Sequence, residues 1–338
     1  MIVMMWRRLV TVVLSALVLS GGAAVGQDRP AIITSLSLFA GTAEGLWRSG
    51  DWGHTWERVR GTTAGVRLDG LGAARVVLPL GPQVYVAGDG GLYVSNDFGE
   101  SWNPVSLTTG ISSLLLSRWP QADPTVFAGT DAGLLRSRDG GRTFGPTALT
   151  SGPVRRLDWP GPALLVAYAG GLLVTMDEGE TFATPTRGLP VGEVRAMALS
   201  SFFAVDPVLF AASATGGVFR SVDGGSTWTP AGLADDVVHD LVWLGPFLYA
   251  AGEGGFYRSD DNGAHWTRLS ASPGRPSTLL FPLAPAAGLE AFLATDRGLF
   301  HTSDAGGHWA ATGFEGQEVL TIATYPPPRP DLDTEVGP

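Results

Sequence analysis

Residues Leu209 to Ala231 read LFAASATGGVFRSVDGGSTWTPA, and this stretch decides the fold. A short apolar run leads into a Gly-Gly pair, a second run follows, and a second glycine turn comes just before Trp228. Apolar runs bounded by glycine turns are the pattern of β-hairpins. The stretch therefore predicts three short antiparallel strands joined by two tight turns.

Copies of this pattern cover the chain seven times, with a repeat length of about 42 residues, the size of a propeller blade. The copies are residues 38–59, 84–105, 126–147, 164–185, 209–231, 248–269 and 291–312. One further apolar run separates or follows the copies, at residues 76–80, 111–116, 154–159, 194–199, 237–243, 278–283 and 319–325. We therefore expect four strands per repeat and an all-β fold, a single seven-bladed β-propeller.

The ends of the repeat array predict how the ring closes. The first copy has little sequence before Leu38 for an innermost strand, and no copy follows the run at 319–325. We expect this C-terminal strand to join the first blade, which removes the exposed edges that an open stack of sheets would leave.

The second turn of every copy carries the motif [S/T]-x-D-x-G-x-[T/S/H]-[W/F], which we name the aspartate turn. Its Asp is suited to accept hydrogen bonds from its own loop, its Gly permits positive φ, and its aromatic residue is suited to fill space between blades. We expect these residues to be structural. The aspartates are Asp51, Asp97, Asp139, Asp177, Asp223, Asp261 and Asp304, and the aromatic residues are Trp56, Trp102, Phe144, Phe182, Trp228, Trp266 and Trp309.

The aspartate turn resembles the Asp box of bacterial-neuraminidase-type (BNR) repeats. The phrase SSFFAVDPVLFAASATGGVFRSVDGGSTWTPAG, at residues 200–232, resembles repeats of photosystem II stability/assembly factor-like proteins and of sortilin-type propellers. The resemblance implies a WD40/YVTN/BNR-like propeller. For function it implies several classes, since sialidases, xyloglucanases, sorting receptors and assembly factors share the repeat.

Composition and the two ends of the chain predict an exported protein. Residues 1–26 combine Arg7 and Arg8, an apolar run and small residues before Gln27, which is typical of a signal peptide. The propeller is assigned to residues 27–325 and a proline-rich, acidic, disordered tail to residues 326–338. The chain has no cysteine and a net charge of −10, which argues against disulfides and nucleic-acid binding. We expect the leader to be cleaved and the protein to be a secreted, periplasmic or surface-exposed monomer, with membrane contact only if the leader stays uncleaved.

The first turn of each copy is the candidate binding surface, because it lies at the opposite end of the hairpin from the aspartate turn. Five of these turns carry an acidic residue, namely Glu44, Asp89, Asp131, Glu253 and Asp296. If they face one rim, they form a negative ring that attracts a cation or a basic segment of a partner protein. The alternative is that Asp simply suits glycine-containing hairpin turns.

Two functions follow from these features. The first is a non-catalytic protein-binding or assembly scaffold with no catalytic residue, metal or cofactor. The second is a carbohydrate-active protein, either a lectin or a glycoside hydrolase such as a sialidase-like enzyme, which needs two carboxylates about 5–10 Å apart. Candidates outside the repeat pattern are Asp69, Asp158, Asp235, Asp236, Asp240, Trp119, Trp159 and Trp243. Arg48, Arg136, Arg220 and Arg258 share one repeat position, which favours pairing between blades over a substrate clamp.

Overall fold

A computed structural model describes residues 37–60, 68, 71, 74–80, 83–105, 107, 110–117, 123–158, 163–184, 187–190, 192–200, 206–282 and 290–325. All of them belong to one compact unit, Ile33–Pro338. The predicted signal peptide at 1–26 and the predicted tail at 326–338 lie outside the described residues. In the described part of the chain, no helix is long and apolar enough to span a membrane.

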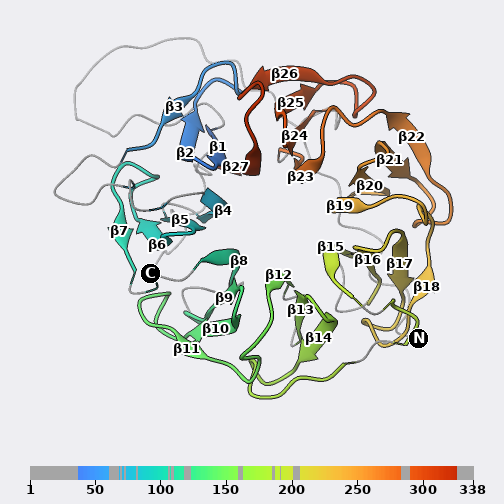
Figure 1. The fold of residues 1–338 in the computed structure, drawn as a ribbon, viewed down its shortest axis with the longest axis horizontal. Helices are drawn as coiled ribbons and strands as arrows, with labels where there is room; N and C mark the ends of the chain where they lie inside the picture. The colour runs from blue at the N-terminus through green and yellow to red at the C-terminus, as the bar shows by residue number, and fades with distance from the viewer. Residues whose placement is uncertain are drawn as a thin grey trace, which may run out of the picture. The chain divides into compact units, whose positions relative to one another are not determined.

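Seven antiparallel sheets follow one another in a ring, which confirms the predicted seven-bladed β-propeller (Figure 1). We number the blades in chain order and give each from its innermost strand outward. Blade 1 is β27 (Val319–Tyr325), β1 (Ser37–Thr42), β2 (Gly45–Ser49) and β3 (Glu57–Arg58); blade 2 is β4 (Ala74–Leu80), β5 (Gln83–Gly88), β6 (Gly91–Ser95) and β7 (Asn103–Pro104); blade 3 is β8 (Ile111–Leu116), β9 (Val126–Thr130), β10 (Gly133–Ser137) and β11 (Gly145–Pro146).

The remaining blades follow the same order. Blade 4 is β12 (Val154–Asp158), β13 (Leu164–Tyr168) and β14 (Gly171–Thr175); blade 5 is β15 (Val194–Leu199), β16 (Leu209–Ser213), β17 (Val218–Ser221) and β18 (Thr229–Pro230); blade 6 is β19 (Val238–Leu244), β20 (Phe247–Gly252), β21 (Phe256–Ser259) and β22 (Thr267–Ser270); blade 7 is β23 (Pro276–Leu280), β24 (Ala291–Thr295), β25 (Gly298–Thr302) and β26 (Ala310–Gly313). In blade 4 a single bridge, Val174 to Ala183, stands where the other blades have a fourth strand.

The C-terminal strand closes the ring as predicted. β27 pairs antiparallel with β1, with Leu38 opposite Thr324 and Thr42 opposite Val319. The first and last described strands of the chain thus share one sheet, at the meeting point of the blue and red ribbons in Figure 1. Blade 1 therefore has an innermost strand, as the other six blades do.

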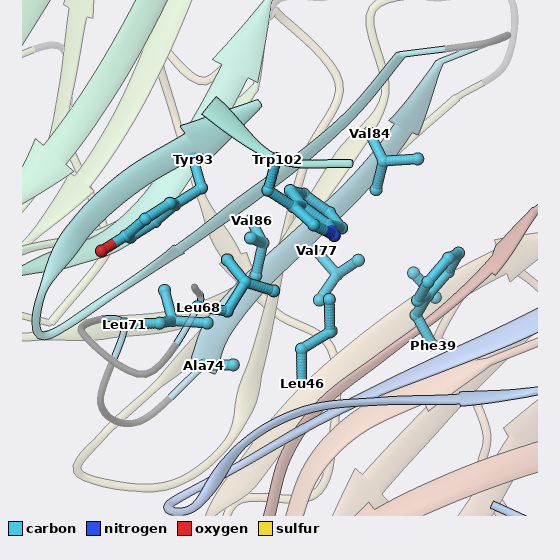
Figure 2. Packing of buried hydrophobic residues seen from close by; sticks show 11 residues of the cluster. Phe39, Leu46, Leu68, Leu71, Ala74, Val77, Val84, Val86, Tyr93 and Trp102 are labelled. Carbon is cyan, nitrogen blue, oxygen red and sulfur yellow. The ribbon is translucent and has the colours of Figure 1, made fainter. Parts of the chain in front are cut away.

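The hydrophobic core lies between neighbouring blades. Figure 2 shows one such cluster, in which Phe39 and Leu46 of blade 1 lie near Val77 and Trp102 of blade 2. Trp102 comes from the aspartate turn of blade 2, and only 3% of it is exposed. The apolar face of each sheet is thus covered by the next sheet around the ring, and the second strand of each blade is almost entirely buried.

Every innermost strand carries a β-bulge near its start. In blade 2, Ala74 pairs with Gly88 and Val76 with Ala87, which leaves Arg75 as the extra residue. The same shift recurs in all seven blades. A bulge re-aims the side chain of its extra residue. The bulge residues are Leu320, Arg75, Ser112, Arg155, Arg195, His239 and Ser277, in blade order.

Candidate functional site

The aspartate turns form self-contained hydrogen-bond networks. In blade 1, the Ser49 hydroxyl donates to Asp51 Oδ1 at 2.8 Å. Thr55 donates its N–H to Oδ1 at 2.9 Å and its hydroxyl to Oδ2 at 2.6 Å. The same three bonds recur in every blade, with Ser101 in place of the Thr in blade 2 and His265 and His308 in its place in blades 6 and 7.

These hydrogen bonds stabilise the charged form of each carboxylate. The Thr55 hydroxyl, followed by the Thr55 N–H, lowers the pKa of Asp51 to about 2. The Thr175 hydroxyl does the same for Asp177, whose pKa is also lowered to about 2. Because each carboxylate is bound within its own hairpin, the turns do not bring unlike groups together as a catalytic site requires.

The aromatic residue of each aspartate turn packs against the preceding blade. Trp228 belongs to a cluster with Leu165 and Leu172 of blade 4, and Trp266 donates its Nε1–H to the Ala231 carbonyl of blade 5. Trp102 and Trp228 are buried, at 3% and 4% exposure, while the other five aromatic residues are half-buried.

The five acidic turns lie at the end of the blades where the innermost strands begin. Strand register places Val238 opposite Gly252, next to Glu253, and Ala74 opposite Gly88, next to Asp89. These acids have cationic or N–H neighbours from the innermost strand or the segment just before it. Asp89 pairs with Arg75 at 2.7 Å, Asp131 with Arg155 at 3.1 Å, Glu253 Oε1 lies 3.1 Å from His239 Nε2, and Asp296 accepts the Arg275 N–H at 2.8 Å. In blade 1, the Glu44 carbonyl, not its carboxylate, accepts from Arg58.

All seven bulge residues line one cavity of about 710 Å³ at the centre of the ring. Three of them are arginines and one is a histidine, in a chain whose net charge is −10. None of the five acids predicted from the sequence is among the lining residues, and the sequence analysis did not identify the cations that are. The bulges that bring these cations to the cavity cannot be identified by aligning the repeats, because the innermost strands carry no shared motif.

Arg195, His239 and Glu253 form a chain of contacts at the wall of this cavity. Arg195 Nη1 lies 3.3 Å from His239 Nδ1, so it donates to an imidazole whose Nε2–H points to Glu253. Burial lowers the pKa of His239, and the charge of Arg195 lowers it further, while the hydrogen bond to Glu253 opposes the shift. The Nε of Arg195 is buried and has no hydrogen-bond partner.

A second ion pair crosses the ring. Arg156 of β12 binds Asp240 of β19, skipping blade 5, where the corresponding residue is Ala196. Asp240 is 2% exposed and also accepts the backbone N–H of Leu279 in β23 at 2.8 Å. Asp240 thus links blades 4, 6 and 7, which explains its burial.

The other candidates lie apart from the cavity or outside the described residues. Asp236 is buried and accepts the Gly254 N–H at 2.9 Å, Asp235 is exposed, and Trp243 packs edge-on against Phe210. Asp158 is at the end of β12. Asp69, Trp119 and Trp159 lie outside the described residues.

Two of the four periodic arginines pair between blades. Arg48 reaches Glu100 of blade 2 at 2.6 Å, and Arg136 reaches Glu180 of blade 4 at 2.7 Å. Arg258 lies over the Phe247 ring, at 4.8 Å from its centroid. In blades 6 and 7 the residues corresponding to Glu100 and Glu180 are Ala264 and Gly307, so Arg220 and Arg258 lack that partner.

The described lining of the cavity has few side chains that could bind a metal ion or catalyse glycoside hydrolysis. Glu193 is the one carboxylate among its described lining residues, and it pairs with Arg155 at 3.1 Å. Within the described ranges, no three His, Asp or Glu side chains gather as metal ligands. Glycoside hydrolysis uses two carboxyl groups, so the cavity lining does not supply this pair.

Comparison with known proteins shows likeness in fold. No profile of a known protein family matches the chain, and no curated protein matches its sequence. YCF48 bound to a D1 peptide superposes with a TM-score of 0.53 at 18% identity, over 70% of this chain and 80% of that one. YCF48 from Cyanidioschyzon merolae gives 0.52 at 15% identity, over 70% and 88%.

An enzyme has a similar fold. An ancestral GH74 enzyme superposes with a TM-score of 0.62 at 15% identity, over 85% of this chain and 47% of that one, so this chain spans about half of the enzyme's length. The neighbours therefore include both a peptide-bound protein and an enzyme. What they share with this chain is the β-propeller fold.

Proposed function

We propose that this chain is a non-catalytic propeller that binds a segment of another protein at the end of the central cavity where the acidic turns lie. The observation that carries the proposal is that all seven blades present their bulge residue to one cavity. This arrangement gives a single concave site with a few polar and charged groups above apolar side chains, which is the usual make-up of a binding site.

Two further points support a protein partner. YCF48, which shares the fold, is bound to a peptide in its solved structure. The residues around the cavity include both guanidinium and carboxylate groups, which suits a polypeptide with polar side chains. We also propose that the chain is exported, on the basis of residues 1–26, and that its aspartate turns are Asp boxes of the BNR type.

Site-specific crosslinking tests this proposal. A photoreactive amino acid replaces Arg75 at the cavity, or Met176 in the aspartate turn of blade 4, where 66% of the side chain is exposed. Envelope fractions of the native organism should give a crosslinked protein from position 75 and none from position 176, and the yield should fall with salt because charges contribute. Equal crosslinking from both positions, or none from position 75, contradicts the proposal.

The carbohydrate-active alternative has its own test. A panel of fluorogenic glycosides should give no turnover, because the described cavity lining supplies one carboxylate. Turnover that is abolished by Glu193→Gln would favour a glycoside hydrolase.

A further inference from the structure

The guanidinium groups of the cavity differ in how they are neutralised. Arg75 pairs with Asp89, Arg155 with Asp131 and Glu193, and Arg156 with Asp240. Arg195 is the exception among the described lining residues, because its one side-chain contact there is with the imidazole of His239. A charge with no counter-charge faces the cavity at this point.

The surroundings of Arg195 keep it available for a ligand. His239 gives its Nδ1 to Arg195 and is held by Glu253 on its other nitrogen, so the neutral ring orients the guanidinium without cancelling its charge. Arg195 has five N–H donors, and its buried Nε–H is unsatisfied. Arg195 as a whole is half-buried and lines the cavity, so a ligand acceptor in the cavity can approach the rest of its guanidinium.

The same cavity has an apolar wall. Val76 and Leu78 of β4 and Leu115 of β8 line it together with Arg195. A planar guanidinium prefers a carboxylate or phosphate oxygen pair, and a wall of branched aliphatic side chains favours an apolar group. Phosphate, which is strongly hydrated, gains nothing from such a wall. A carboxylate attached to an apolar residue satisfies both features.

We propose that Arg195 anchors a carboxylate of the partner segment, with an adjacent apolar side chain of that segment against Val76, Leu78 and Leu115. This inference rests on the proposed function for the identity of the partner as a polypeptide. The carboxylate is either the C-terminus of the segment or an acidic side chain. The other two bulge arginines, Arg75 and Arg155, already have carboxylate partners and do not bind this carboxylate.

Short blocked peptides test the inference on the full-length chain. Acetyl-alanyl-leucine carries a C-terminal carboxylate, acetyl-leucyl-glutamyl-alaninamide carries a side-chain carboxylate, and acetyl-alanyl-leucinamide carries none. Binding is followed by NMR through the ring protons of His239, which contacts Arg195, and through the Nε–Hε signal of Arg195 itself.

We expect at least one acidic peptide to shift both signals and the neutral amide to leave them unchanged. Arg195→Gln should weaken binding of the acidic peptide by about tenfold or more, since a charge-assisted pair is lost. Arg75→Gln, the same substitution at the corresponding bulge of blade 2, is the matched control and should change affinity by about twofold or less. Which acidic peptide binds identifies the source of the carboxylate.

Three results would overturn the inference: no binding of either acidic peptide, equal binding of the neutral amide, or equal losses in the two variants. The crosslinking experiment separates this failure from that of the proposed function. If a partner is crosslinked at position 75 but the acidic and neutral peptides bind equally, the proposed function is supported and the role of Arg195 is contradicted. If the acidic peptide binds at Arg195 but no partner is crosslinked, the carboxylate site is supported and the proposed function is contradicted.

Discussion

Replacing Trp228 by alanine measures how much one inter-blade aromatic residue contributes to stability. Trp228 is 4% exposed, packs against Leu165 and Leu172 of blade 4, and donates its Nε1–H to the Gly225 carbonyl at 2.9 Å. A buried Trp removes about 150–250 Å² from water, which at about 25 cal/mol/Å² gives an upper value of about 4–6 kcal/mol.

Compaction of the denatured chain reduces this value, and the residual cavity increases it. We therefore expect Trp228→Ala to lower the free energy of unfolding by about 3–5 kcal/mol, in the range of other buried Trp→Ala changes. Urea unfolding followed by far-UV circular dichroism measures the difference, and an unchanged m-value shows that the same surface is exposed in both proteins.

Trp52→Ala is the matched control, since Trp52 is also in an aspartate turn but is 40% exposed. Its φ of 61° is retained by alanine, so backbone strain does not change, and the loss should be about 0.5 kcal/mol or less. A loss below about 1 kcal/mol for Trp228→Ala, or equal losses for the two variants, would refute the inter-blade packing described above.

Three further predictions follow from the same geometry. The contribution of the aspartate turns to stability should be constant well above pH 4 and fall as the pH drops from the ordinary Asp pKa of 3.8 toward about 2, because protonation in the unfolded chain precedes protonation in the folded one; urea midpoints across this range measure it for the turns of Asp51, Asp177 and Asp261. Asp240→Ala should cost about 2–4 kcal/mol, because it leaves two backbone N–H groups and a partly exposed guanidinium unpaired. Arg156→Ala should cost at least as much by the same assay, because it leaves the Asp240 carboxylate, which is 2% exposed, without its counter-charge. Gly99→Ala should cost about 1–3 kcal/mol because its φ is +89° and the new Cβ would lie 3.2 Å from a Phe39 ring carbon, whereas Gly110→Ala, with nothing within 4 Å, should be nearly neutral in thermal melts.

The sequence predicts the architecture well because the repeat is local. Each strand, turn glycine and turn aspartate recurs within one hairpin, so the pattern needs no knowledge of distant contacts. The innermost runs at 111–116, 194–199 and 319–325 coincide with β8, β15 and β27. Closure of the ring by the last of these follows from counting the runs.

The site was harder to predict because its contacts join different blades. Arg156 and Asp240 lie two blades apart in the chain, and no local pattern relates them. The acidic turns lie at the same end of the blades, but their ion pairs depend on bulge residues such as Arg75 and Arg155, which a strand pattern treats as ordinary positions. Whether these acids bind a partner stays a prediction.

The pairing of β27 with β1 has a consequence for how the chain acquires its structure. β1 pairs with β2 early, but it lacks its inner neighbour until β27 has been made, so this last pairing closes a loop of nearly the whole propeller and must offset its closure entropy. A ribosome-bound chain would hold blade 1 incomplete, with a free edge on β1, and would be open to capture by chaperones. Joining Tyr325 to Ser37, which lies opposite it in the sheet, by a short linker and cutting the chain between two other blades should speed folding while leaving the same final ring.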